Sequence, residues 1–342
     1  MAKLKGLLLT EGMHGMISQV EGLAKALDLD FIHEKIELNS FWKLFPPKLT
    51  PVSSNVYKKI ISSDFDVIIS CGRKSVIPSI HLKKNSNKKV INIHIQNPKV
   101  NFKNFDFIVA PEHDGITGEN VINTKGAIHY LTKEEILTNK NYLDSFIKKD
   151  QRKIITLIIG GPTKYYDYSD ENIEKIFNNL KTLVEKKEYQ LVIIPSMRTP
   201  KSIIEKAKLF FGERHTVIES VDKKAYLSAL AISEYIVVTC DSSSMISEAA
   251  LTGKPIYIAN IEPKKNDNRF QQFRNLFKDM GLGSIGLHHH QSGGGWNLPN
   301  RHAGDVCWLV GNDRTIVVAT GHRLHLFPRF DWVATGEGSR PA

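Results

Sequence analysis

The chain has 342 residues, of which 41% are hydrophobic and 24% are charged, a composition typical of a globular protein large enough for two α/β domains. No apolar run approaches the roughly 20 residues of a membrane-spanning helix. The start of the chain lacks the long apolar segment that a signal peptide needs, so the sequence predicts a cytoplasmic protein. The net charge of +10 fits either peripheral association with an anionic inner-membrane surface or a general lysine bias without an anionic partner. Nucleic acid is not predicted as a partner, because the chain has no nucleic-acid motif.

The composition changes abruptly after Lys278. No lysine follows this residue, and three of the four tryptophans lie beyond it. The five arginines of residues 279–342 are balanced by five acidic residues, so the whole net charge falls on residues 1–278. We therefore expect residues 285–342 to form an atypical tail, either foreign to the rest of the chain or poorly ordered. The His288–His290 triplet has no partner ligands at a metal-binding spacing, so no metal site is predicted.

The first 130 residues alternate between short apolar runs and amphipathic segments, a pattern that indicates a parallel sheet with crossover helices. Strands are expected at Leu4–Leu9, Asp30–Ile36, Val67–Ser70, Val90–His94, Phe107–Ala110 and Val121–Asn123. Helices are expected at Met16–Leu27, Asn55–Ser62 and Pro78–Lys84. The segment Phe41–Pro51 carries aromatic residues and three prolines. We interpret it as a packed loop, with an acceptor-binding or membrane-facing role as the alternative.

Polar side chains follow several of these strands. Because the carboxyl ends of parallel strands meet at one edge, where ligands of open sheets bind, we predict the acceptor side of a cleft there. Its expected residues are Gln19, Arg73, Gln96, Glu112, Asp114 and Asn120. His113 stands between two carboxylates, which should raise its pKa, and either it or His14 is the candidate general base. The alternative is that Glu112–Asp114 is a solvated surface loop.

A polar segment, Lys133–Lys149, is predicted to be a connector helix within residues 131–150, joining a domain of residues 1–130 to a domain of residues 151–284. In the second domain we expect strands at Lys153–Ile159, Gln190–Ile194, Thr216–Ile218, Glu234–Val238 and Ile256–Ile258. Helices are expected at Asp170–Lys187, Lys201–Phe211, Lys223–Ala231, Ile246–Leu251 and Asn268–Met280. Cys71 and Cys240 come at strand ends and are expected to be buried, reduced thiols.

The turns after the strands of the second domain suit a nucleotide. The Gly160-Gly161 turn would let backbone N–H groups approach a phosphate, and Arg198 could pair with one. Ser242 begins a serine-rich helix start, whose positive end favours anions, and Glu248 could accept hydrogen bonds from two ribose hydroxyls. The predicted site is completed by Thr163, Ser196, Thr199, Asp241 and Ser244. The alternative is that the serines only cap the helix and Glu248 only favours its positive end.

Several stretches resemble the mitochondrial-fission ELM family of plants and alphaproteobacteria. They are GMHGMISQVEGLAKAL, PEHDGITGENVINTKGAIHYLT, GGPTKYY, the SMRTP turn and VTCDSSSMISEAALTGKPIY, all within residues 6–281. The family usually has SRRTP, so Met197 stands where an arginine is common. The resemblance implies a GT-B-like α/β fold, two Rossmann-like domains facing a cleft, similar to enzymes that use nucleotide-diphosphate sugars. It also implies that Glu248 holds the ribose, with Ser242 and Ser244 at the phosphates.

Two functions follow from this resemblance. One is a metal-independent glycosyltransferase without a bound cofactor, which moves a sugar from a nucleotide-diphosphate donor to a cell-envelope acceptor. The other is a non-catalytic scaffold that binds a membrane surface or a dynamin-like partner, since plant members are implicated in recruiting a dynamin-related protein to mitochondria. A nucleotide-sugar epimerase is disfavoured, because neither a dinucleotide GxGxxG motif nor a Tyr-x-x-x-Lys pair is present. The oligomeric state is left open.

Overall fold

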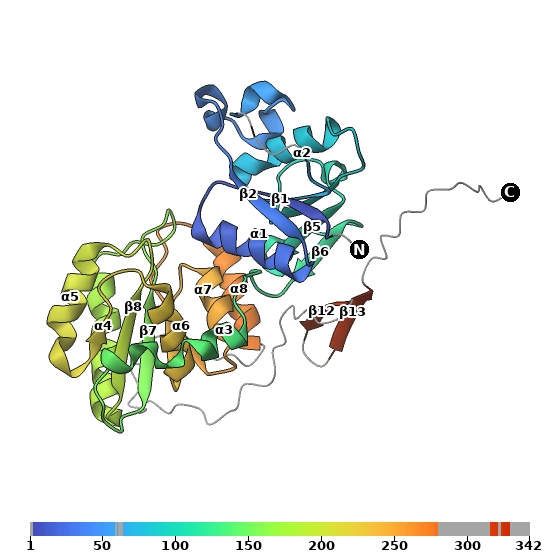
Figure 1. Cartoon of the computed structure of the whole chain (residues 1–342). Coiled ribbons are helices and arrows are strands. Elements are labelled where there is room, and N and C mark those ends of the chain that lie inside the picture. The colour runs from blue at the N-terminus through green and yellow to red at the C-terminus, as the bar shows by residue number, and fades with distance from the viewer. Residues whose placement is uncertain (1–2, 59, 61–63, 280–314, 321–322, 329–342) are drawn as a thin grey trace.

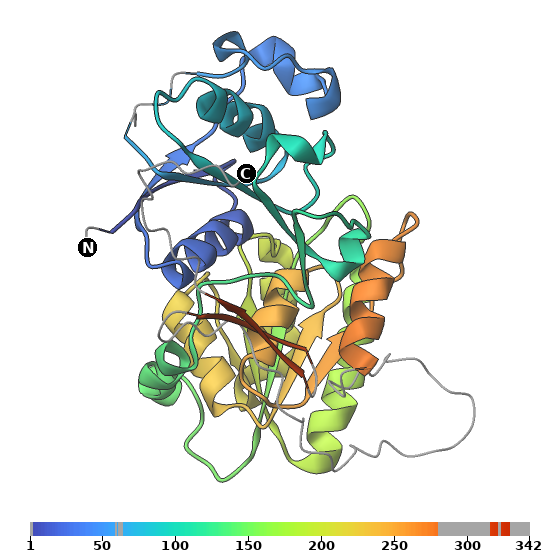
Figure 2. The same ribbon diagram turned by 90° about the vertical axis from the view of Figure 1, so that its right-hand side faces the viewer.

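The computed structural model describes residues 3–58, 60, 64–279, 315–320 and 323–328. Two parallel sheets, each covered by helices, form two Rossmann-like domains, and Figure 1 shows them one above the other. A quarter turn of the view, in Figure 2, shows α1 (His14–Ala26, blue) of the first domain next to the helices of the second. The predicted class, α/β with two Rossmann-like domains, is confirmed.

The first domain contains a six-stranded parallel sheet in the order β2-β1-β3-β4-β5-β6. Its strands are β1 Lys5–Thr10, β2 Asp30–Lys35, β3 Val67–Cys71, β4 Ile91–Ile95, β5 Phe107–Pro111 and β6 Val121–Thr124. Leu8 packs with Val20 of α1 (His14–Ala26), while Leu7 packs with Ile77 of α2 (Val76–Lys84). Adjacent strand residues thus enter different cores, and this two-sided burial is why the strands are continuous apolar runs in the sequence.

The second domain contains a five-stranded parallel sheet in the order β11-β10-β7-β8-β9. Its strands are β7 Ile154–Ile159, β8 Gln190–Pro195, β9 Thr216–Val217, β10 Tyr235–Thr239 and β11 Ile256–Ala259. Its helices are α4 Asp170–Lys187, α5 Lys201–Phe211, α6 Lys223–Ile232, α7 Ser243–Ala250 and α8 Asn268–Asp279. The predicted strands and these helices agree with the structure to within a few residues at each end.

Two predicted helices are wrong. In place of a helix at Asn55–Ser62, a short 3₁₀ turn at Ser54–Val56 is followed by Tyr57, which forms an isolated antiparallel bridge with Leu38. The connector is not one helix but α3, Lys133–Thr138, followed by a 3₁₀ turn.

The side chains at the end of α3 explain the interruption. Thr138 Oγ1 donates to the Glu134 carbonyl at 2.9 Å, and Asn139 Nδ2 donates to the Glu135 carbonyl at 2.8 Å. Side chains that hydrogen bond to nearby backbone groups in this way compete with helix propagation.

The tail lies mostly outside the described residues, including the His288–His290 triplet and Cys307. Within it, β12 Thr315–Thr320 and β13 Arg323–Pro328 form an antiparallel hairpin. Cys71 and Cys240 are free and buried, as predicted. None of the helices in the described ranges is long and apolar enough to cross a bilayer.

Candidate functional site

The starts of α1 and α7 face each other across the boundary between the two domains. A Cβ atom added to Gly15 would lie 3.4 Å from Ser244 Oγ. Neither helix has an acidic residue in its first turn. Met13, which precedes α1, makes no side-chain cap, and Ser242 caps α7 by accepting a hydrogen bond from the Met245 N–H at 3.4 Å. Two positive helix ends therefore converge, an arrangement that suits an anionic group.

Cationic side chains surround Tyr130 at this boundary. The ammonium of Lys25, from α1, lies 5.0 Å from the centre of the Tyr130 ring, and that of Lys223, from α6, lies 4.6 Å from it. His14 is exposed at the first position of α1, and its Nε2 atom is 3.4 Å from the Tyr130 hydroxyl. The predicted base His14 therefore lies among groups that can stabilise negative charge.

Glu248 is buried near the end of α7, with 7% of its surface exposed. It accepts a hydrogen bond from the Tyr226 hydroxyl at 2.8 Å. Burial raises the pKa of Glu248 to about 7, and the Tyr226 hydrogen bond and the charge of Lys223 partly offset this rise. The helix dipole favours carboxylates only in the first turn. Glu248 lies past that turn, so the interpretation that it only favours the positive end of α7 is wrong.

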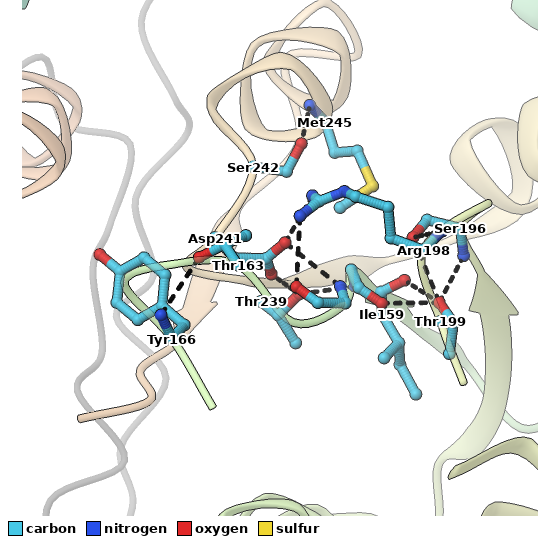
Figure 3. A network of polar contacts seen from close by, with 12 residues as sticks. Ile159, Thr163, Tyr166, Ser196, Arg198, Thr199, Thr239, Asp241, Ser242 and Met245 are labelled. Atoms are coloured by element: carbon cyan, nitrogen blue, oxygen red, sulfur yellow. Dashed lines mark hydrogen bonds and ion pairs between the residues drawn. The ribbon is translucent and has the colours of Figure 1, made fainter. Parts of the chain in front are cut away.

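Asp241 is the centre of a buried polar network beneath α7 (Figure 3). Its carboxylate accepts hydrogen bonds from the hydroxyls of Tyr168 and Thr239, the latter at 2.7 Å. It also accepts hydrogen bonds from Arg198 Nη2 at 2.6 Å and from the Gly161 N–H at 3.3 Å. With four donors the carboxylate is fully satisfied inside the protein, and Arg198 is held by it as an ion pair.

The two glycines after β7 allow close packing. A Cβ atom on Gly160 would lie 2.2 Å from Asp241 Oδ2, and one on Gly161 would lie 2.0 Å from the Arg198 carbonyl oxygen. Their N–H groups donate to Thr239 Oγ1 and to Asp241 respectively. The predicted exposure of these N–H groups toward a phosphate is therefore corrected: the structure uses them internally, and only glycine fits between the neighbouring turns.

Three other predicted phosphate ligands shape turns. Thr163 Oγ1 accepts from the N–H groups of Tyr165 and Tyr166, each at 3.1 Å. Ser196 Oγ accepts from the Arg198 N–H at 3.3 Å. Thr199 Oγ1 lies 2.7 Å from the Gly160 carbonyl oxygen and 2.8 Å from that of Ile159. These hydroxyls act as local supports of the kind common in polar turns.

His113 differs from the prediction. Burial lowers its pKa to about 4, and the positive charge of Arg269 lowers it further. Arg269 Nε binds Asp114 at 2.7 Å, Lys125 binds Glu112 at 2.7 Å, and the His113 ring packs against Phe273 of α8. The expected rise in pKa is wrong, because α8 contributes a cation and an apolar cover to this turn. The solvated-loop alternative is also wrong for His113, which is buried.

Three of the predicted acceptor residues lie close together, because Asp114 accepts a hydrogen bond at 3.3 Å from the N–H of Asn97, the neighbour of Gln96. Gln19 donates to the Gly15 carbonyl at 3.0 Å and accepts from Gln96 Nε2 at 3.4 Å, so these residues meet near the start of α1. Gln96 has φ +81°, a strained conformation of the kind that concentrates at functional sites.

Arg73 and Asn120 serve other contacts. Arg73 donates to the carbonyls of Lys43 at 2.9 Å and Phe45 at 3.3 Å. Asn120 Nδ2 donates to the backbone carbonyls of Phe102 and Phe105, each at 2.9 Å. Both side chains hold loops of the first domain, and their assignment to the acceptor side stays a prediction.

A family model described as mitochondrial fission ELM1 matches residues 14–285. The chain belongs to this family. It is 21% identical over 241 residues to the mitochondrial fission protein ELM1 of Arabidopsis thaliana, covering 63% of this chain and 56% of the plant protein. An uncharacterised protein of Rickettsia prowazekii (strain Madrid E) is 28% identical over 229 residues, covering 56% of this chain and 64% of that protein. The chain thus spans less than two thirds of the length of either relative.

The ELM1-family chain is similar in structure to the UDP-GlcNAc 2-epimerase of Methanocaldococcus jannaschii, with a TM-score of 0.51 and 14% identity over 83% of this chain and 89% of that one. MurG of Acinetobacter baumannii gives a TM-score of 0.46 and 12% identity over 84% and 86% of the two chains. The predicted GT-B-like fold is confirmed. At such identity the likeness shows the fold alone.

Sequence reasoning missed several residues of the candidate site. Tyr226 is 22 residues from its partner Glu248 and lies on another helix, and Tyr130 and Lys223 come from different elements. No spacing rule relates such positions, so no local signal marks them. Among the residues that the structure describes, no cluster of side chains could hold a metal ion.

Proposed function

We propose that this ELM1-family chain binds a nucleotide-diphosphate sugar at the boundary between its domains. The diphosphate lies at the facing starts of α1 and α7, near Ser242 and Ser244, and the ribose hydroxyls bind Glu248. The observation that carries the proposal is the buried Glu248 carboxylate, which gains nothing from the helix dipole and is costly to ionise without hydrogen-bond donors. A ribose diol supplies two such donors.

The same arrangement supports transfer of the sugar to a cell-envelope acceptor. The bond between the sugar anomeric carbon and the diphosphate breaks as an acceptor hydroxyl attacks that carbon, and His14 takes the hydroxyl proton. The leaving diphosphate is stabilised by the two helix ends and by Lys25 and Lys223. His14 is preferred as the base over His113 because His14 is exposed at the boundary, whereas His113 is buried under α8.

Calorimetric titration with UDP-GlcNAc and UDP tests the ribose assignment. Glu248→Gln should weaken binding by about 10-fold to 100-fold, because a hydrogen bond to a charged acceptor contributes about 1.5–3 kcal/mol. The matched control is Glu234→Gln, an exposed glutamate of the same domain that pairs with Lys153, and it should bind like the natural chain. If a folded Glu248→Gln protein bound UDP-GlcNAc as tightly as the natural chain, Glu248 would not be the residue that binds the ribose.

Binding should also strengthen as the pH rises through about 7. The ribose hydroxyls donate to the ionised carboxylate, and the pKa of Glu248 is about 7, so at pH 6 most chains must first release a proton. Affinity should therefore be about tenfold lower at pH 6 than at pH 8. Calorimetry at pH 6, 7 and 8 measures this change. A pH dependence that persists in Glu248→Gln would assign it to another group.

The second candidate function is a scaffold without turnover, which binds an anionic membrane surface, such as the inner membrane, or a dynamin-like partner. It is supported by the net charge of +10 and by the fission role in the name of the Arabidopsis relative. Release of labelled sugar separates the two functions. Nucleotide-sugar binding with no sugar released to any acceptor or to water would favour the scaffold.

A further inference from the structure

The segment of residues 38–58, here called the apolar loop, forms the outer end of the first domain. Its base is closed by the antiparallel bridge between Leu38 and Tyr57 and by a hydrogen bond from Asn39 Nδ2 to the Asn55 carbonyl at 2.7 Å. Figures 1 and 2 both place this blue segment beside α2, on the side of the first domain that is away from the second domain. The apolar loop therefore lies at the outer end of the first domain, and it contains none of the residues of the candidate nucleotide site.

Large apolar side chains point into solvent from this loop. Leu44 is 82% exposed and Leu49 is 65% exposed, and Phe41 and Val52 are exposed as well. Single exposed apolar residues are normal on protein surfaces. The other exposed large apolar residues in the described ranges are scattered over the chain, whereas these four fall within residues 41–52. Such clustering indicates an interaction surface.

The apolar loop is held in place by its own contacts. The rings of Phe41, Trp42 and Phe45 contact each other with centroids 4.9 to 5.7 Å apart, and Trp42 also packs against the core of the domain. From outside the loop, Arg73 donates hydrogen bonds to the carbonyls of Lys43 and Phe45. The exposure of Leu44 and Leu49 is thus a fixed feature of the fold. Burying these side chains against a partner would therefore cost little conformational entropy.

All charged side chains of the apolar loop are positive. Residues 38–58 include three lysines and no acidic residue. Lys58 is paired with Glu37 of the preceding segment. Lys43 and Lys48 are exposed, and neither makes an ion pair with any residue that the structure describes. Unpaired lysines beside exposed leucines match the layered chemistry of an anionic membrane, with phosphates outside and acyl chains beneath.

We propose that the apolar loop docks the chain on an anionic membrane, with Leu44 and Leu49 inserted among the acyl chains and Lys43 and Lys48 at the lipid phosphates. Lipid can surround separate side chains that protrude from a loop, whereas a protein partner would need a surface shaped to each of them. This docking uses none of the residues that are proposed to bind the nucleotide sugar.

Co-sedimentation of the full chain with vesicles tests the proposal. Vesicles of phosphatidylcholine mixed equally with phosphatidylglycerol should bind the natural chain at low salt and bind it less at high salt, and vesicles of phosphatidylcholine alone should bind it weakly. Leu44→Ser with Leu49→Ser should lower partitioning about tenfold or more. Lys43→Gln with Lys48→Gln should lower it roughly tenfold and reduce its salt dependence.

Matched controls come from the second domain. Leu209 of α5 is 88% exposed, and Lys175 of α4 is exposed, so Leu209→Ser and Lys175→Gln should bind vesicles like the natural chain. Thermal melting confirms that each variant is folded, and UDP-GlcNAc titration should be unchanged in all of them. The proposal is overturned if the natural chain does not bind the mixed vesicles, or if it binds neutral vesicles equally well. It is also overturned if the leucine variant binds as tightly as the natural chain, or if the controls lose binding to the same extent.

Discussion

Acidification from pH 7 to pH 5 should lower the free energy of unfolding by about 4 kcal/mol through four buried groups alone, a large part of the stability of a typical domain. Burial lowers the pKa of His94 to about 3 and the pKa values of His113 and His129 to about 4. These side chains stay neutral in the fold, while the unfolded chain takes up protons below its usual histidine pKa near 6.5. Stability is therefore lost as the pH falls from about 6.5 toward 4, by about 2 kcal/mol per histidine at pH 5.

Glu248 acts in the opposite direction. Burial raises its pKa to about 7 from an ordinary value of 4.5. Between pH 4.5 and pH 7 the folded state holds a proton on Glu248 that the unfolded chain has released. The contribution of this group to stability therefore falls as the pH rises. Acidification to pH 5 consequently restores about 2 kcal/mol of the roughly 6 kcal/mol that the three histidines remove.

Urea unfolding at pH 7 and pH 5, followed by circular dichroism, measures this balance. His113→Gln should reduce the loss of stability between the two pH values by about 2 kcal/mol, and Glu248→Gln should increase it by about 2 kcal/mol. Each variant is compared with itself, so the folding cost of the substitution cancels. Identical losses in the three proteins would contradict both pKa shifts.

Asp241→Ala should lower the free energy of unfolding by about 3 kcal/mol or more. The substitution leaves the Gly161 N–H without its acceptor inside the protein, takes away one of the two acceptors of the Tyr168 hydroxyl, and removes the buried partner of Arg198. The loss should also loosen the turn after β7, because Gly160 and Gly161 pack directly against this network. Denaturant unfolding of the purified variant gives the value.

Asp241→Asn is the matched control for that experiment. The amide has the same shape and keeps one acceptor oxygen, so it should cost less than the alanine variant. If Asp241 only supports the site, the folded asparagine variant should bind UDP-GlcNAc with nearly natural affinity. A destabilisation below about 1 kcal/mol in the alanine variant would show that the network contributes little to stability.

The sequence by itself determined most of the secondary structure. Runs such as Ile154–Ile159 are apolar throughout because both faces of a parallel strand are buried. The bounds of α4 follow from Ser169, whose hydroxyl accepts from the Asn172 N–H, and from the apolar period of the helix. These signals are short-range, so a local pattern carries them completely. The predicted connector helix failed after Thr138, where side chains compete for the backbone hydrogen bonds.

The site depended on tertiary structure. The sequence pattern was enough to place Ser242 at the start of the helix that carries Glu248. It was not enough to show that Glu248 lies past the first turn of that helix, in contact with Tyr226. The pKa of His113 was predicted with the wrong sign, because its neighbours in sequence are carboxylates while its neighbours in space are Arg269 and Phe273. A pKa depends on burial and on charges within a few ångströms, and only packing between distant segments determines both.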